Sequence, residues 1–176
     1  MTRNQVSIVV GMLLFLVMSV FNTAMAKDMA DNPIDQAFAG DFKVATSTAE
    51  LNYVAGKYRE AWKMEMVNVA AVIKRQYKFP EDQARIDAYT AAYEQAATAA
   101  GAVEWLNWSD TKEQPKNRWF GTGAISASLL AEANIYKQAT LNLIDTYQGS
   151  AAGNPDAKAT YTYGYAGQGA ELEKLK

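Results

Sequence analysis

The chain has 176 residues, enough for one domain of ordinary size, and carries 17 basic against 19 acidic residues. It contains neither cysteine nor histidine. Their absence removes disulfides, the usual general base, the commonest zinc and copper ligand, and the Ser-His and Cys-His nucleophile pairs. The composition therefore argues against an enzyme, a metal centre and a cofactor site. The mild negative charge argues against nucleic-acid binding.

The first 26 residues have the layout of an export signal. Arg3 precedes an apolar run over residues 6–21, and Ala24-Met25-Ala26 supplies the small-x-small pattern that signal peptidase cuts. The run has about 16 residues, fewer than the roughly 20 of a membrane span. We expect cleavage after Ala26, a periplasmic or secreted location if the source is bacterial, and no stable membrane insertion afterwards. An uncleaved membrane anchor is the alternative.

Residues 27–45 show no sustained apolar period and contain Asn32-Pro33 and Gly40. Both features interrupt regular structure. We predict an extended N-terminal arm here, with one short turn of helix over residues 34–38.

The pattern over residues 47–77 predicts a long first helix. Ser47 and Glu50 have the spacing of a capping box, and Pro80 disfavours helix at the residue before it. Apolar residues recur at three- and four-residue steps. They are Leu51, Val54, Tyr58, Trp62, Met66, Val69, Ile73 and Tyr77.

A second helix is predicted over residues 81–106, with Pro80 at its first position and Glu81 and Asp82 near its positive end. Residues 96–102 are nearly all small and would permit close helix contact, although Gly101 costs roughly 1 kcal/mol relative to alanine. The expected inward row is Ile86, Tyr89, Tyr93, Ala96, Ala100, Val103 and Leu106.

A third helix is predicted over residues 123–147, with Gly149 as its stop. Its expected inward residues are Ile125, Leu129, Ala133, Tyr136, Leu143 and Tyr147. Nothing in the mature chain alternates convincingly at a period of two. The sequence therefore predicts an all-α fold, an antiparallel bundle of three long helices over residues 46–148.

Residues 149–176 hold five of the eleven glycines together with Asn154-Pro155. Such a stretch buries too little apolar area to offset its ordering entropy. We predict a flexible C-terminal tail, in which Tyr161, Tyr163 and Tyr165 could still pack on the bundle or on a partner.

Three weaker patterns in the sequence contain residue types that can support chemistry. Residues 109–112 match Ser-x-x-Lys, but neither companion motif of that enzyme class is present. Glu81, Asp82 and Asp87 cluster, yet the helix start already explains acidic residues there. The pair Gly121 and Gly123 enters a helix and could hold an anion, although a flexible helix entry explains it better.

The strongest candidate site is the stretch WLNWSDTKEQPKNRWFGTG at residues 105–123. In one interpretation Trp105 and Trp119 close the end of the bundle. In the other, one or two exposed rings anchor a partner, since tryptophan and arginine are enriched in binding hot spots. The candidate partner-binding residues are Trp108, Lys116, Arg118, Trp119 and Phe120.

The start of the first helix, Thr46-Ser47-Thr48-Ala49-Glu50-Leu51-Asn52 followed by Val54-Ala55 and Tyr58, resembles the opening of the LprI-like lysozyme-inhibitor family. The order of export signal, two long helices, glycine-containing loop and final helix is also similar. Val54 stands where that family has a cysteine, Trp62 replaces its aspartate, and Glu65-Met66 replaces its Leu-Asn pair. The resemblance implies a helical lysozyme inhibitor.

Together these patterns predict an exported, non-enzymatic envelope protein that binds another protein. The specific hypothesis is an inhibitor or immunity-type protein that occludes a cell-wall hydrolase such as lysozyme. The alternatives are a structural or assembly component of an envelope, secretion or conjugation apparatus, and a small-ligand carrier with a pocket between alanine-rich helix faces.

Overall fold

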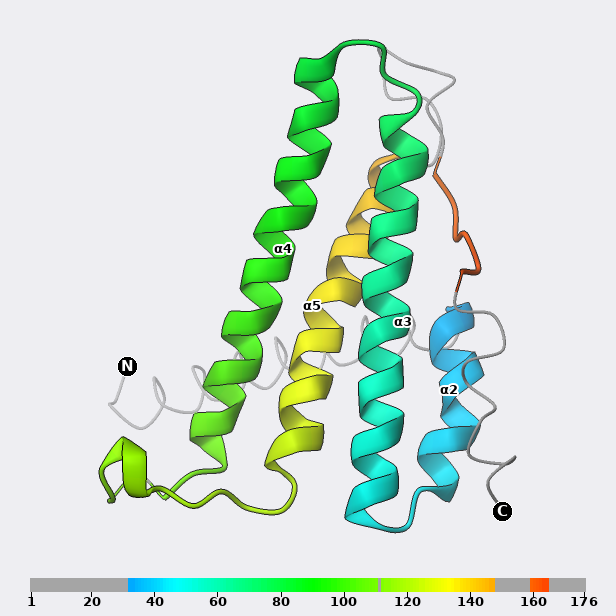
Figure 1. Ribbon diagram of the computed structural model, residues 1–176. Helices are drawn as coiled ribbons and strands as arrows, with labels where there is room; N and C mark the ends of the chain where they lie inside the picture. Colours follow the sequence, from blue (N-terminus) through cyan, green and yellow to red (C-terminus); the bar gives the residue numbers. More distant parts are fainter. Residues whose placement is uncertain (1–31, 111, 148–158, 165–176) are drawn as a thin grey trace, which may run out of the picture. The chain divides into compact units, whose positions relative to one another are not determined.

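The computed structural model describes residues 32–110, 112–147 and 159–164. Within them lie four α-helices and the 3-10 turn η1, and no strand (Figure 1). The bounds are α2 Pro33–Val44, α3 Thr48–Lys74, α4 Pro80–Asn107, η1 Pro115–Asn117 and α5 Ala124–Thr146. The prediction of an all-α protein is confirmed for these residues. The predicted export signal at residues 1–26 lies outside them.

None of the helices within the described residues is long and apolar enough to cross a membrane.

The two predicted boundaries of each long helix agree with the structure to within three residues. Boundary agreement follows from local signals, which in this chain are a capping box, a proline and glycines.

The prediction of an extended arm is wrong over Pro33–Val44, which forms α2, although the short helical turn predicted over residues 34–38 lies within this helix. Asn32 caps this helix, because its Oδ1 accepts the backbone N–H groups of Ile34 at 2.9 Å and Asp35 at 3.0 Å. These bonds satisfy donors that a helix start leaves free. The sequence interpretation treated Asn32-Pro33 as a break in structure, whereas the pair is the cap and first residue of a helix.

The second half of α2 contributes aromatic rings to the core beside α3. The rings of Phe38 and Phe42 meet the ring of Tyr58 edge-on, with centroids 5.5 and 5.4 Å apart. Phe38 is fully buried. Edge-to-face pairs of this kind add to the stabilisation from burial alone.

The capping box predicted for α3 is confirmed. Ser47 Oγ accepts the N–H of Glu50 at 3.2 Å, and the Glu50 carboxylate accepts the N–H of Ser47 at 3.0 Å. Backbone hydrogen bonds from Thr46 and Ser47 lower the pKa of Glu50 to about 2. The predicted apolar row also holds. Its buried members are Val54, Tyr58, Trp62, Met66, Val69 and Ile73.

The inward row predicted for α4 is wrong at three of its seven positions. Ala96, Val103 and Leu106 are exposed, the last two by 66% and 53%. The residues that α4 buries are Ile86, as predicted, and Ala97 and Gly101, which the predicted row did not include. In its C-terminal half the helix therefore turns small residues toward its neighbours and leaves Val103 and Leu106 outside.

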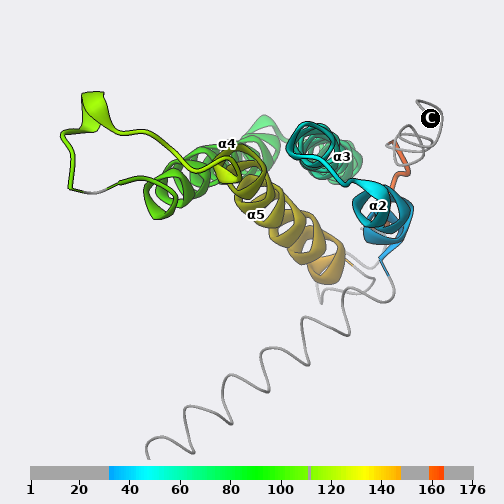
Figure 2. The same ribbon diagram turned by 90° about the horizontal axis from the view of Figure 1, so that it is seen from below.

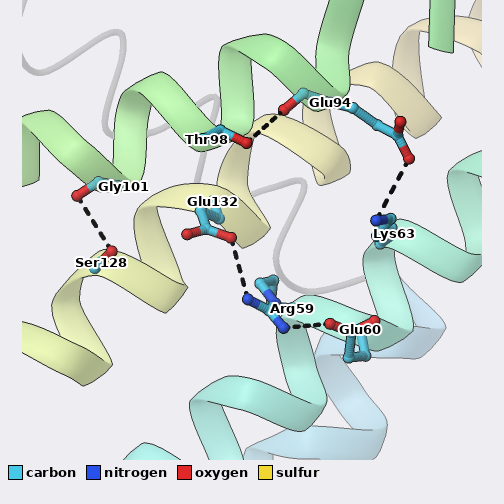
Figure 3. A network of polar contacts seen from close by, with 8 residues as sticks. All are labelled: Arg59, Glu60, Lys63, Glu94, Thr98, Gly101, Ser128 and Glu132. Carbon is cyan, nitrogen blue, oxygen red and sulfur yellow. Dashed lines mark hydrogen bonds and ion pairs between the residues drawn. The ribbon is translucent and has the colours of Figure 1, made fainter. Parts of the chain in front are cut away.

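Gly101 accounts for this orientation, because side chains of α5 lie directly against it. A Cβ atom at Gly101 would lie 2.6 Å from Glu132 Oε1 and 2.9 Å from Ser128 Oγ. The Ser128 hydroxyl donates to the Gly101 carbonyl at 3.1 Å, and Arg59 of α3 binds Glu132 at 3.3 Å (Figure 3). The expectation that small residues in α4 permit close helix contact is thus confirmed at Gly101.

Residues 159–164, here called the strap, lie against the helices. The Ala159 N–H donates to the Tyr147 carbonyl at 3.0 Å. Thr162 donates both its backbone N–H and its hydroxyl to the carboxylate of Glu65, the hydroxyl at 2.9 Å. Glu65 is completely buried. The strap is therefore anchored, while the rest of the predicted flexible tail lies outside the described residues.

We predict opposite effects for two helical Gly→Ala substitutions. Gly101→Ala should lower the free energy of unfolding by about 1 kcal/mol or more, because overpacking outweighs the gain in helix propensity. Gly56→Ala is the matched control, since its Cβ would lie 3.9 Å from Leu129, an ordinary contact. It should stabilise by roughly 0.5–1 kcal/mol in urea unfolding. Equal gains at both glycines would contradict the close approach.

Thr162→Val should destabilise the protein by about 1–3 kcal/mol, because it removes one hydrogen-bond donor from the buried Glu65 carboxylate. Thr160→Val is the control, since Thr160 is exposed on the same strap. Thermal and urea unfolding of both variants measures the difference. If the two variants were equally stable, Thr162 would not anchor the strap.

Candidate protein-binding site

Residues 108–123, here called the tip loop, connect α4 to α5. Ser109 and Phe120 form an isolated antiparallel β-bridge, and the Gly121 N–H donates to the Trp108 carbonyl at 3.0 Å. These contacts hold the base of the loop together, and η1 forms its far part. Figure 2 shows the loop extending away from the ends of α4 and α5.

Trp108 is fixed within this base. Its Nε1 donates to Glu104 Oε1 at 3.0 Å. Its ring lies so close to the following chain that a Cβ at Gly123 would be 2.7 Å from it, and a Cβ at Gly121 would be 3.1 Å from it. The two glycines therefore make room for an indole ring, which accounts for them without an anion.

Trp105 and Phe120 form a second aromatic contact at the same end. Their rings meet edge-on with centroids 4.6 Å apart. Trp105 is half-buried, whereas Phe120 remains 41% exposed. Phe120 is thus partly structural, and Trp105 packs against it at the base of the loop.

Trp119 differs from these rings because 71% of it is exposed. It does not close the end of the bundle, which corrects that part of the structural interpretation. Lys116 lies on η1, three residues before Trp119 in the sequence, and is exposed. Arg118 is half-buried, and its Nε donates to the Glu113 carbonyl at 3.0 Å. Trp119 is thus the most exposed of the three predicted aromatic binding residues, since Trp108 and Phe120 are 42% and 41% exposed.

Further apolar side chains reach solvent at this end of α4 and α5. Val103, Leu106 and Ile125 are 66%, 53% and 45% exposed. The sequence interpretation assigned all three to the core and missed them as surface residues. Their position next to the tip loop was the available signal, because a helix end beside a long loop is less completely covered than a helix centre.

The other chemical patterns have structural partners. Asp87 pairs with Lys74 at 2.5 Å, and Asp82 pairs with Arg85 at 3.7 Å. The Ser109 hydroxyl donates to the Leu106 carbonyl at 2.9 Å. Among the described residues, no group of three or more His, Cys, Asp or Glu side chains could hold a metal ion. Residue 111 of the Ser-x-x-Lys stretch is outside the described residues.

A groove of about 470 Å³ lies between α4 and α5 at the other end of α4. It is lined by Arg85, Ile86, Tyr89, Asn142, Leu143, Thr146 and Tyr147. Its two tyrosine hydroxyls already have partners, the Ala139 carbonyl and the Tyr77 hydroxyl. Burial raises the pKa of Tyr89, and the hydrogen bond with Tyr77 raises that of Tyr147 to about 12. The ligand-carrier alternative expected a pocket between alanine-rich helix faces, but no alanine lines this groove.

Comparison with known proteins gives no matching family model, no matching curated protein and no matching solved structure.

Trp119→Ala should leave the free energy of unfolding within about 0.5 kcal/mol of the parent protein, because the ring is largely solvent-exposed. Trp108→Ala should destabilise by more, since it removes ring packing on two glycines and a hydrogen bond to Glu104. Urea unfolding measures the stability difference, and acrylamide quenching of Trp fluorescence measures ring accessibility. A large stability loss for Trp119→Ala would show that this ring is structural.

Proposed function

We propose that this chain is an exported, non-enzymatic protein that binds another envelope protein through its tip loop. The partner we propose is a cell-wall hydrolase of the lysozyme type, whose cleft the loop would block. The helices would act as an antiparallel three-helix bundle, with α2 added beside α3, and would hold the loop at one end. The exposure of Trp119 on an otherwise fastened loop is the observation that carries this proposal.

The fastening of the loop supports a binding role for Trp119. Trp108 is held by Glu104 and by close packing on glycines, and Ser109 is paired with Phe120. A loop that is already ordered loses little conformational entropy when it binds. A large exposed ring on such a loop has the properties of a hot-spot residue.

The charges of the loop also suit a hydrolase cleft. Most glycoside hydrolases place two carboxylates in the cleft where the glycan binds. The exposed Lys112 and Lys116 carry no salt bridge within the described residues, whereas Asp110 accepts the backbone N–H of Lys112. Inhibition by steric blocking would need only that Trp119 enters the cleft and that these ammonium groups meet its carboxylates.

The assembly-component alternative has less support, because it relied on a free C-terminal tail. The strap lies on α3 with Thr162 bound to the buried Glu65. Deletion of residues 149–176 would therefore expose that carboxylate and destabilise the protein, so loss of a partner after this deletion would not identify the tail as a binding element. Substitution within the tip loop separates the two functions more cleanly.

The test is titration of purified lysozyme-type hydrolases with the mature protein, following lysis of cell-wall substrate. We expect stoichiometric inhibition of at least one hydrolase. Inhibition by Trp119→Ala should be weaker by about 30-fold or more, which corresponds to the loss of about 2 kcal/mol of binding free energy expected for a hot-spot residue. Phe79→Ala is the matched control, because Phe79 is 67% exposed just before α4, at the opposite end from the loop.

Unchanged inhibition by Trp119→Ala would remove the tip loop from the site. No inhibition of any lysozyme-type hydrolase by the folded parent protein would overturn the proposed partner.

A further inference from the structure

The groove between α4 and α5 has the size and the lining of a small-molecule site. Its volume of about 470 Å³ lies within the usual range of such sites, about 300–1,000 Å³. Ile86 and Leu143 are buried in its lining, and Tyr89 and Tyr147 are half-buried beside them. The surface of the groove is mainly apolar, so it can hold a small apolar body.

The hydroxyl groups of both tyrosines have partners within the protein. The Tyr89 hydroxyl donates to the Ala139 carbonyl at 2.9 Å, and the Tyr77 hydroxyl donates to the Tyr147 hydroxyl at 3.2 Å. Because these oxygens are already bonded, a ligand that covers the two rings does not have to supply a polar group there. Rings of this kind favour offset or edge-to-face contact with another aromatic ring.

The polar lining of the groove favours an anionic group. Of the described residues that line it, Arg85 alone carries a charge, and Asn142 and Thr146 can both donate hydrogen bonds. The side chain of Arg85 is 82% exposed, and its ion pair with Asp82 is 3.7 Å long, too long for a hydrogen bond. A guanidinium binds a carboxylate through two parallel hydrogen bonds. The lining therefore matches a carboxylate.

The directions of the helices separate the polar end of the groove from its aromatic part. α4 and α5 run in opposite directions, since Gly101 bonds to Ser128 whereas Tyr89 bonds to Ala139 (Figure 1). Arg85 lies one turn before Tyr89, which places it level with the last turn of α5. That turn carries Thr146. A ligand along the groove can thus reach Arg85 with one end and Tyr89 with the other.

We infer that this groove binds a small molecule that has one aromatic ring and one carboxylate. The Arg85 guanidinium binds the carboxylate, and the Thr146 hydroxyl lies at the same end of the groove. The ring of the ligand lies against Tyr89 and Leu143. The inference is independent of the proposed function, because no residue of the tip loop lines the groove.

The surrounding charges set the expected strength of binding. Asp82 precedes Arg85 by three residues and Asp145 precedes Thr146, but neither acidic residue lines the groove. Their charges offset the long-range attraction of Arg85, so direct hydrogen bonds must select the carboxylate. An exposed ion pair contributes little by itself, and ligands of about twelve non-hydrogen atoms bind weakly. We therefore expect a dissociation constant of roughly 1 mM.

Titration of the mature protein with 4-phenylbutyrate, followed by the chemical shifts of backbone amides in NMR spectra, tests the site. The shifts should change at residues 85–89 and 142–147 and not in the tip loop. The neutral amide of the same compound, 4-phenylbutyramide, should bind about fivefold more weakly, because it cannot pair with Arg85. Absence of shift changes at about tenfold the expected dissociation constant, or changes confined to other residues, would overturn the inference.

Arg85→Gln separates the carboxylate contact from the apolar contact. It should weaken the binding of 4-phenylbutyrate about fivefold and leave that of the amide unchanged. The thermal unfolding midpoint should stay close to that of the parent, because Arg85 is exposed. Arg75→Gln is the charge-matched control, since Arg75 is exposed but does not line the groove, and it should bind both compounds normally. Equal binding of 4-phenylbutyrate by Arg85→Gln and the parent would show that the groove does not select a carboxylate.

Discussion

The close approach of α5 to α4 at Gly101 determines which side of α4 faces solvent. Glu132 and Ser128 occupy the space that any Cβ at Gly101 would need, and Glu132 is also held by Arg59 of α3. Because this contact turns small residues inward, Val103 and Leu106 are left outside. One steric constraint thus creates both the tight helix junction and the apolar surface beside the tip loop.

The part of the fold that could be predicted is the part specified by local signals. The capping box at Ser47 and Glu50 starts α3, and a single strongly apolar row from Val54 to Ile73 gives that helix one side to bury. The aromatic stretch was likewise found from its composition. The sequence could identify the loop as a candidate site because four large rings gather within residues 105–123.

The rest of the fold and of the candidate site depends on contacts between residues that are far apart in the sequence. In α4 two sides are plausible, since alanine occurs on both, and only the fit of Gly101 to α5 decides between them. Which tryptophan is exposed depends on whether a glycine or a carboxylate lies nearby, as Glu104 does for Trp108. The anchoring of the strap needs Glu65 and Thr162, which are 97 positions apart. Hydrophobic periodicity contains no information on such pairs.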